Sequence, residues 1–364
     1  MKKKLNILEF CLSPDLGGLE LFMINCFKSF KNQSNCTIIV EKDTKLDKYL
    51  GSNNQFHIER NKFFPIIPAL KLAKYINDNN IDIIHFHWTK DIATIVLAKI
   101  LSSKNPKIIQ TRNMTMTRFK SDFYHKWLYK NVSGMHAVTN QVKDQLAKFI
   151  PNEILPKIEM IYMGTQQQNI DDKKVQDLKS KYNITEDDFV VGIVGRIQEN
   201  KGQYLVIDAI KELNNPNIKA MIVGHTMDDT YLNNLKESVK KSKLENQIFF
   251  TGFTKEVNEH MKIFDVNVLA TPKETFGLVV IEAMMNKVCM IATNQGGPLE
   301  IIEDKKDGLL FDRTSKDLAV KIESLYNNLE YKNTLALEGY KKAKIKFNND
   351  EQLSKLYGFI SGLY

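Results

Sequence analysis

Residues 189–202, FVVGIVGRIQENKG, join a short apolar run to a polar loop that ends in glycine. The run is short and rich in β-branched residues, so it predicts a buried strand. The loop contains Arg196 and Lys201, and a helical pattern follows Gly202. A strand, a loop and a helix in this order form the repeating unit of a parallel α/β sheet.

The same unit recurs along the whole chain. The first half contains the runs LNILEF, CTIIV, IDIIHFH, KIIQT, GMHAV and IEMIY, and the second half adds KAMIVG, IFFTG, VNVLAT, CMIAT and GLLFD. A chain of 364 residues is long enough for two cores. We therefore predict an α/β protein with two Rossmann-like doubly wound domains, residues 1–170 and 171–345, facing across a cleft. Residues 346–364 are expected to form a helix that packs back on the first domain.

Charge is spread unevenly between the halves. Residues 1–170 carry 24 Lys and Arg against 14 Asp and Glu, a net +10, whereas residues 171–364 carry 27 against 29, a net −2. A basic half could meet anionic lipid, nucleic acid or a phosphorylated substrate. No nucleic-acid recognition motif accompanies the charge, so we expect no nucleic-acid partner.

The sequence suggests where the chain is found. It has no C-x-x-C pair, no apolar run long enough to span a bilayer, and an N-terminus whose apolar stretch is interrupted by Asn6 and Glu9. We expect a reduced, cytoplasmic protein, bound peripherally to the inner face of the cell membrane.

Residues 116–131, MTRFKSDFYHKWLYKN, are the strongest candidate for membrane contact. Phe119, Phe123 and Trp127 have helical spacing, and the cations among them are Arg118, Lys120, Lys126 and Lys130. This pattern is typical of a basic, aromatic interfacial helix, although core packing of the aromatics explains it equally well. Residues 60–76 have a similar composition.

Two loops could hold phosphate. Arg196 and Lys201, with a helix starting at Gly202, would bind a diphosphate well, and a solvated basic loop is the alternative. Gly17 and Gly18 precede a helical pattern and suit either close approach to an anion or an ordinary turn. There is no G-x-G-x-x-G and no Walker A motif, which argues against a nicotinamide cofactor and leaves no cofactor to predict.

Two glutamates eight positions apart, Glu274 and Glu282, could be an acid/base pair for sugar cleavage. Gly277 followed by an apolar run predicts a loop entering a helix, with Glu274 before the helix and Glu282 one to two turns inside it. The carboxylates then need not meet, and a surface position for Glu282 is equally compatible. A helix N-terminus between two acceptors also suits a sugar nucleotide.

His85 and His87 lie on one face of a predicted strand. A metal site would need further ligands, and the sequence shows no matching cluster. We therefore predict no metal and expect His87 to line the cleft as an acceptor or membrane contact.

Taken in order, these pieces resemble the retaining glycosyltransferases of family four, which have the glycosyltransferase-B fold. The resemblance covers nearly the whole chain. It rests on GGLE at 17–20, VTNQVKDQL at 138–146, IYMGT at 161–165, VGRIQENKG at 194–202, IVG at 222–224, FTGF at 250–253, ETFGLVVIE at 274–282, GGPLEII at 296–302 and DGLLF at 307–311. The E-x7-E pattern is its strongest element.

The resemblance implies a role for each matched residue. Arg196 and Lys201 would hold the donor diphosphate, Glu274 the donor sugar, and Glu282 the ribose. Further donor contacts would come from Gly17, Gly18, Phe253, Thr254, Thr275, Phe276, Gly277 and Leu278. Acceptor or membrane contacts would come from His87, Arg118, Lys120 and Trp127. Reaction by same-face attack would need no metal.

The chain departs from the family at two places. Asn113 stands where many relatives have histidine; it can orient a hydroxyl and is counted among the catalytic candidates, but it cannot act as a base near neutral pH. Met163 replaces a frequent asparagine.

We predict a retaining transferase that moves a hexose or N-acetylhexosamine from a nucleotide diphosphate sugar, UDP favoured and GDP possible. The acceptor would be a hydroxyl of a lipid-linked glycan, lipopolysaccharide or other surface polysaccharide. A catalytically impaired sugar-nucleotide-binding protein and a glycosidase or phosphorylase remain the alternatives.

Overall fold

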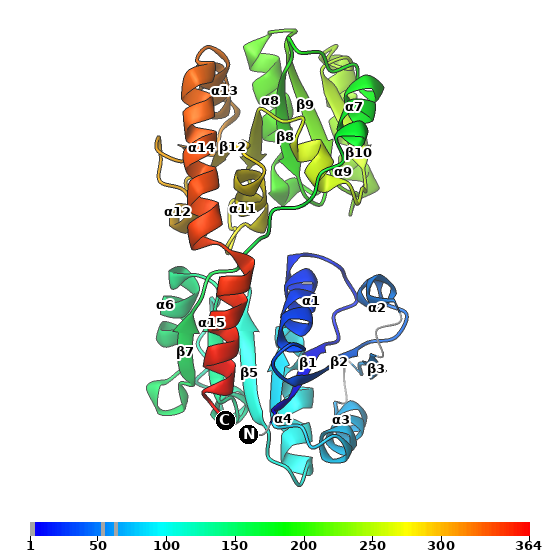
Figure 1. Ribbon diagram of the computed structural model, residues 1–364, viewed down its shortest axis with the longest axis vertical. Coiled ribbons are helices and arrows are strands. Elements are labelled where there is room, and N and C mark those ends of the chain that lie inside the picture. Colours follow the sequence, from blue (N-terminus) through cyan, green and yellow to red (C-terminus); the bar gives the residue numbers. More distant parts are fainter. Residues whose placement is uncertain (1–3, 52–54, 62–64) are drawn as a thin grey trace. The chain divides into compact units, whose positions relative to one another are not determined.

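The computed structural model describes residues 4–51, 55–61 and 65–364. They divide into two compact units, one of residues 1–163 with 349–364 and one of residues 164–348 (Figure 1). The predicted boundaries at 170 and 345 lie close to these. Each unit is built on one sheet of parallel strands.

Unit 1 has the strand order β3-β2-β1-β4-β5-β6-β7. The strands are β1 (Asn6–Cys11), β2 (Asn35–Val40), β3 (Phe56–His57), β4 (Ile83–Phe86), β5 (Lys107–Arg112), β6 (Gly134–Ala137) and β7 (Lys157–Met160). Its helices are α1 (Gly18–Phe30), α2 (Lys45–Leu50), α3 (Ile66–Asp78), η1 (Thr89–Asp91), α4 (Ile92–Leu101), α5 (Phe123–Lys130), α6 (Asn140–Phe149), η2 (Asn152–Ile154) and α15 (Asn349–Ser361).

Unit 2 has the strand order β10-β9-β8-β11-β12-β13. The strands are β8 (Phe189–Val194), β9 (Ile218–Val223), β10 (Ile248–Gly252), β11 (Val266–Leu269), β12 (Cys289–Thr293) and β13 (Leu309–Phe311). Its helices are α7 (Asp172–Lys181), η3 (Glu199–Lys201), α8 (Gln203–Leu213), α9 (Asp229–Lys241), α10 (Val257–Met261), α11 (Leu278–Met285), α12 (Pro298–Ile301), α13 (Ser315–Tyr326) and α14 (Leu329–Lys346).

Every predicted strand is present, and the two-residue strand β3 is the one that the sequence did not indicate. The strands of unit 2 read as apolar runs because helices cover both of their faces, and their side chains form one buried core. The last helix, α15, belongs to unit 1 and packs on α1, and Tyr357 donates to the carbonyl of Gln33, in the turn after α1, at 3.2 Å. No helix in the described ranges is long and apolar enough to cross a membrane.

In each unit the strand order reverses at one point. In unit 2 the reversal lies between β8 and β11, and in unit 1 between β1 and β4. Loops at the carboxyl ends of such strand pairs diverge to opposite faces and leave room for a ligand. The two reversal points are therefore the places to look for function.

Candidate functional site

The reversal point of unit 2 brings Lys201 and Glu274 together. Lys201 follows β8 and Glu274 follows β11, and the Lys201 ammonium donates to a Glu274 carboxylate oxygen at 3.0 Å. Their side chains are 28% and 21% exposed, so a ligand can reach both. Residues 73 positions apart in sequence thus form one polar group at the strand ends.

Gly202 allows this approach. Its φ of +76° lies in the left-handed region, and a Cβ at this position would stand 2.7 Å from the Cβ of Ala270 at the end of β11. Only glycine combines this backbone angle with so short a contact. The start of α8, and Lys201 with it, therefore lies directly against the end of β11.

Arg196 is a half-buried cation in the same loop as Lys201, after β8. Its backbone carbonyl accepts a hydrogen bond from Gln203 Nε2 at 2.9 Å, which fixes the loop. Its guanidinium has no hydrogen-bond or ion-pair partner among the described residues. An unpaired guanidinium at a strand end is suited to an anion such as phosphate.

The loop after β11 enters helix α11 as predicted. Gly277 is the N-cap with a φ of +96°, and α11 runs from Leu278 to Met285. The Gly297 amide donates to the Glu274 carbonyl at 2.9 Å and holds the loop from the side. Thr275 is half-buried and Phe276 is buried, and the backbone amides that follow form the N-terminus of α11.

Glu282 lies in the second turn of α11 and is only partly exposed. Surrounding protein atoms desolvate its carboxyl group and raise its pKa to about 6. No hydrogen-bond or ion-pair partner of this carboxylate is found in the described part of the chain. A desolvated acceptor without a partner is costly for the fold, as expected of a group that is kept for a ligand.

Glu282→Gln is expected to stabilise unit 2 above pH 6 and not at pH 4.5. The folded state binds this proton more tightly than the unfolded chain, whose glutamate pKa is about 4.3, so ionisation opposes folding as the pH rises from there to about 6. Because Glu282 is partly exposed, solvent screening reduces the gain in stability. We expect the melting temperature of the variant at pH 7.5 to rise by about 2–4 °C. Calorimetry at both pH values measures this, and an equal effect at both would refute it.

Phe253 and Thr254 lie at the same edge of the unit 2 sheet as Lys201 and Glu274, but away from the reversal point. They follow β10, which β9 separates from β8. Phe253 is 65% exposed and meets the ring of His225 edge-on at 6.1 Å. The Thr254 hydroxyl accepts from the Glu256 amide at 2.9 Å.

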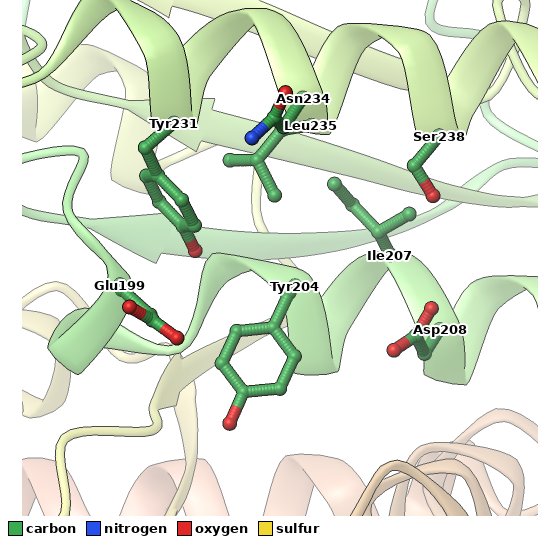
Figure 2. A pocket seen from close by; sticks show the side chains of 8 residues that line it. All are labelled: Glu199, Tyr204, Ile207, Asp208, Tyr231, Asn234, Leu235 and Ser238. Atoms are coloured by element: carbon green, nitrogen blue, oxygen red, sulfur yellow. The ribbon is translucent and has the colours of Figure 1, made fainter.

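A cavity of about 420 Å³ opens between α8 and α9 (Figure 2). Its lining contains the carboxylates Glu199 and Asp208 and no lysine or arginine. Burial raises the pKa of Asp208. Such a lining repels phosphate, so this cavity is not the diphosphate site that Arg196 and Lys201 predict.

At the reversal point of unit 1 the amide of Gly17 is engaged within the protein. The Gly17 amide donates to Glu20 Oε2 at 2.9 Å, and the Ser13 hydroxyl donates to the other oxygen of that carboxylate at 2.5 Å. Gly17 has an extended backbone that any residue can adopt. Glu20 therefore already occupies the Gly17 amide that we expected to face phosphate.

The loop after β4, also at this reversal point, contains His87 and Asp91. Each has one buried polar atom without a hydrogen-bond partner among the described residues. His87 follows β4 and binds Glu9 through Nε2 at 2.8 Å, while its buried Nδ1 has no partner in the described ranges. Asp91 accepts from the Leu12 amide at 3.0 Å, and its second oxygen is buried without a partner there. Burial raises the pKa of Asp91 to about 8. Sequence reasoning did not identify Asp91, although it lies just before an apolar helix.

Asn113 comes directly after β5, next to β4 in the sheet. Both polar atoms of its amide are buried and neither has a hydrogen-bond partner within the described chain. An amide in this state can donate and accept at once, as expected of a group that orients a ligand hydroxyl.

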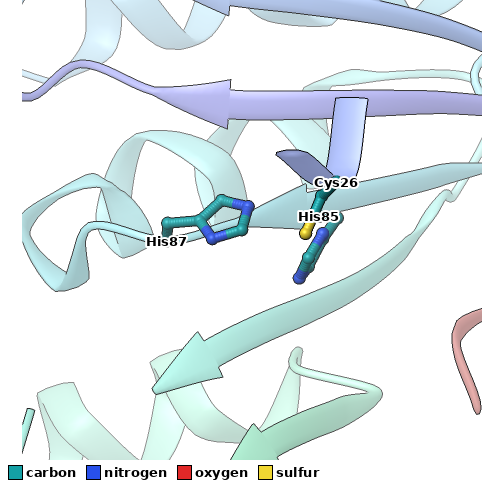
Figure 3. A group of neighbouring side chains, drawn as sticks. All are labelled: Cys26, His85 and His87. Carbon is teal, nitrogen blue, oxygen red and sulfur yellow. The ribbon is translucent and has the colours of Figure 1, made fainter. Parts of the chain in front are cut away.

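Cys26, His85 and His87 lie close enough to bind one metal ion (Figure 3). No spacing in the sequence indicates that a cysteine would lie beside the histidines. Both nitrogens of His85 are engaged, by Glu9 at 2.9 Å and Thr111 at 2.7 Å, and burial raises the pKa of the Cys26 thiol far above its usual range. His85 has no nitrogen left for a metal and the thiolate form of Cys26 is disfavoured, so this set does not suit a metal.

The segment 116–131 is not the continuous helix that its aromatic spacing suggested. Helix α5 begins only at Phe123, because the Asp122 carboxylate accepts from the His125 amide and caps it. Phe119 precedes the helix and packs on Phe149 at 5.1 Å between ring centroids. Trp127 is half-buried, whereas Phe123 is 87% exposed.

The basic side chains of this segment are arranged unevenly. Arg118 is exposed, and Lys120 is half-buried with its ammonium 3.4 Å from His125 Nε2. Lys126 pairs with Glu153 at 3.0 Å. Residues 62–64 of the related stretch 60–76 lie outside the described residues, and from the same stretch α3 exposes Ile66, Ile67 and Leu70.

Two family models match the chain in succession. Residues 9–142 match the model described as glycosyl transferase 4-like, and residues 174–342 match that of glycosyl transferases group 1. Over these two stretches the chain resembles glycosyltransferases. The E-x7-E residues, Arg196 and Lys201 all lie in the second match.

Known glycosyltransferases are similar to this chain along most of its length. The O-antigen biosynthesis glycosyltransferase WclY of Escherichia coli is 24% identical, over 86% of this chain and 95% of WclY. A glycosyltransferase of Rickettsia africae has the same fold, with a TM-score of 0.88, 23% identity and coverage of 99% and 98%. Anabaena HepE, solved with UDP and glucose, has a TM-score of 0.85, 19% identity and coverage of 98% and 100%. The fold is therefore glycosyltransferase-B.

Proposed function

We propose that this protein is a glycosyltransferase that moves a hexose or N-acetylhexosamine from a nucleotide diphosphate sugar to a hydroxyl of a glycolipid or surface glycan, with retention of configuration. The Lys201–Glu274 pair, together with Arg196 on the same loop, whose guanidinium has no partner among the described residues, carries the proposal. A departing nucleoside diphosphate gains negative charge, and preorganised cations are the groups that stabilise it.

Each side chain has a role in the proposed donor site. Lys201 and Arg196 hold the diphosphate, and the amides at the start of α11, from Phe276 to Leu278, add further donors. When Lys201 turns to phosphate, Glu274 is released to accept hydrogen bonds from the donor sugar. Glu282 accepts from the ribose, and Phe253 and Thr254 border the base.

UDP is the proposed donor nucleotide. The similarity in fold to HepE, which was solved with UDP and glucose, supports this choice. Retention follows from same-face attack by the acceptor hydroxyl, with a phosphate oxygen of the leaving group taking its proton. Asn113 orients that hydroxyl, as its two unpartnered amide atoms permit.

A panel of sugar nucleotides tests the donor assignment. UDP-glucose, UDP-N-acetylglucosamine and their GDP counterparts are mixed with the protein, and thermal unfolding is recorded. A ligand present at 100 times its dissociation constant stabilises by about 2.7 kcal/mol, which raises the melting temperature by several degrees. No shift with any sugar nucleotide would refute the proposal.

The acceptor is proposed to be a lipid-linked glycan, as in lipopolysaccharide or surface-polysaccharide synthesis. WclY, which is named for O-antigen biosynthesis, supports this class. The net charge of +10 on residues 1–170 supports attachment to an anionic membrane on its cytoplasmic face.

Phe123→Ser is expected to weaken binding to anionic liposomes about tenfold. Burying a phenylalanine side chain contributes about 1.5–3 kcal/mol, and Phe123 is the most exposed of the large apolar residues described. Trp127→Ser should have a smaller effect because Trp127 is half-buried. Flotation at low and high salt measures both, with Leu329→Ser, an exposed apolar residue of unit 2, as the control. Binding that ignores lipid charge, salt and Phe123 would contradict the proposal.

A further inference from the structure

Unit 1 contains a continuous line of buried polar groups across its sheet. Glu9 on β1 meets His85 Nδ1 at 2.9 Å, and His85 Nε2 meets the Thr111 hydroxyl at 2.7 Å. That hydroxyl also meets His136 Nδ1 at 3.0 Å, and His136 Nε2 lies 2.7 Å from the carbonyl of Ile161. The four side chains are fully buried, so water cannot supply a missing partner.

With Glu9 ionised, the hydrogen bonds along this line fix its protonation. The Ile161 carbonyl can only accept, so His136 Nε2 carries a hydrogen. Burial lowers the pKa of His136 to about 3, which leaves its Nδ1 as an acceptor. The single Thr111 hydrogen must then go to His136. His85 must donate to Thr111 and also to the Glu9 carboxylate, so both of its ring nitrogens are protonated.

Two other arrangements satisfy every bond. The first moves the His85 Nδ1 hydrogen to Glu9 and leaves both groups neutral; burial favours this form, but the interactions of Glu9 with His85 and His87 outweigh burial and lower the pKa of Glu9, so Glu9 is ionised. The second places the extra proton on His136. Thr111 would then donate to His85, and His136 would donate to both Thr111 and Ile161. In that arrangement the charge lies beside a carbonyl, whereas on His85 it lies beside the carboxylate of Glu9. In a buried site the carboxylate stabilises the charge far more strongly. The ion pair is therefore Glu9–His85.

His87 is held by the second oxygen of the same carboxylate. Its Nε2 donates to Glu9 Oε2 at 2.8 Å, and burial lowers the pKa of His87 to about 4, so the ring is neutral. Nδ1 is therefore a lone pair, and it is buried without a partner among the described residues. Figure 3 shows one ring nitrogen of His87 directed toward Cys26 and His85 and the other directed away from them.

We propose that the Glu9–His85 ion pair fixes His87 as a hydrogen-bond acceptor only, and that His87 Nδ1 orients a hydroxyl of the glycan acceptor. His87 comes directly after β4 at the reversal point, the edge of unit 1 where ligands bind in such sheets. The identity of the ligand rests on the proposed function. The protonation of Glu9, His85, His87 and His136 does not depend on that function.

His87 is then a positioning residue and not a base. Accepting a proton would place a second imidazolium on Glu9, beside His85. The other groups that face His87 are His136 from β6, Phe22 and the Cys26 thiol from α1, and none of them is charged. The charge of Glu9 is already paired with His85, and burial lowers the pKa of His87 to about 4, so orientation by His87 should not change between pH 6 and 8.

Nitrogen NMR of the histidine rings in the full-length protein tests both parts. At pH 7.5 we expect two protonated nitrogens on His85 and neutral rings with hydrogen on Nε2 for His87 and His136. Octyl glucoside below its micellar concentration serves as a minimal glycolipid. It should shift the His87 Nδ1 resonance upfield, equally at pH 6.5 and 7.5, and leave His85 unchanged.

The variant His87→Gln separates this role from a structural one. Glutamine keeps a donor toward Glu9, so the His85 signals should persist, while the response to octyl glucoside disappears. Stabilisation by the sugar nucleotide, a property of unit 2, should be retained. A neutral His85, hydrogen on His87 Nδ1, or an Nδ1 resonance indifferent to octyl glucoside would overturn the inference. Absence of sugar-nucleotide binding in the wild type would instead count against the proposed function.

Discussion

Lys201→Ala is expected to lower kcat/KM for sugar transfer about 100- to 1,000-fold. Removing one preorganised donor from a developing negative charge has an effect of this size. Lys201 is placed for this role by Gly202 and by the hydrogen bond to Glu274 at 3.0 Å. Nucleotide release coupled to transfer measures the loss. The kcat should fall as well as the affinity, because the charge on the leaving group is greatest in the transition state.

A matched control lies in the same unit. Lys332 also donates to a carboxylate, that of Asp265, and both side chains are partly buried. It comes from α14 and not from a strand end at the reversal point. Lys332→Ala should therefore change stability and leave kcat/KM within about threefold of the wild type. Similar losses for both variants would show that Lys201 acts through the fold alone.

Glu9→Ala is expected to destabilise unit 1 by about 3–5 kcal/mol. Breaking a buried ion pair leaves an uncompensated charge, and here it also removes the partner of His87. The charges on His85 cannot be solvated, since its side chain has no exposed surface. Chemical unfolding followed by a probe in unit 1 measures the change.

Cys11→Ala is the comparison for Glu9→Ala. Cys11 is equally buried on the same strand and lies outside the polar line, so its truncation measures the cost of lost packing alone. We expect a loss of about 1 kcal/mol for a change of this size. If Glu9→Ala cost no more than Cys11→Ala, the buried ion pair would be refuted.

Local signals were sufficient for most of the fold and for unit 2. Apolar runs identified the strands because parallel strands are buried on both faces. A glycine followed by apolar residues gave the exact start of α11 at Leu278. Asp122 was an available N-cap signal in the segment 116–131, but the aromatic spacing obscured it.

The polar line of unit 1 could not be predicted in the same way. Glu9 only interrupts an apolar run, and its partners His85 and His136 lie on strands that are distant in sequence. Their contact depends on strand order and register, which pair Glu9 with His85 and Thr111 with His136. No spacing rule within one segment contains that information.

The most direct test of the proposed activity is product analysis with a defined donor and acceptor. The protein is incubated with the sugar nucleotide that stabilises it and with octyl glucoside, and the products are resolved by NMR. We predict one nucleoside diphosphate released for each new glycosidic bond, with the anomeric configuration of the donor retained. Sugar release that needs no nucleotide, or that depends on inorganic phosphate, would contradict the account and indicate a glycosidase or phosphorylase.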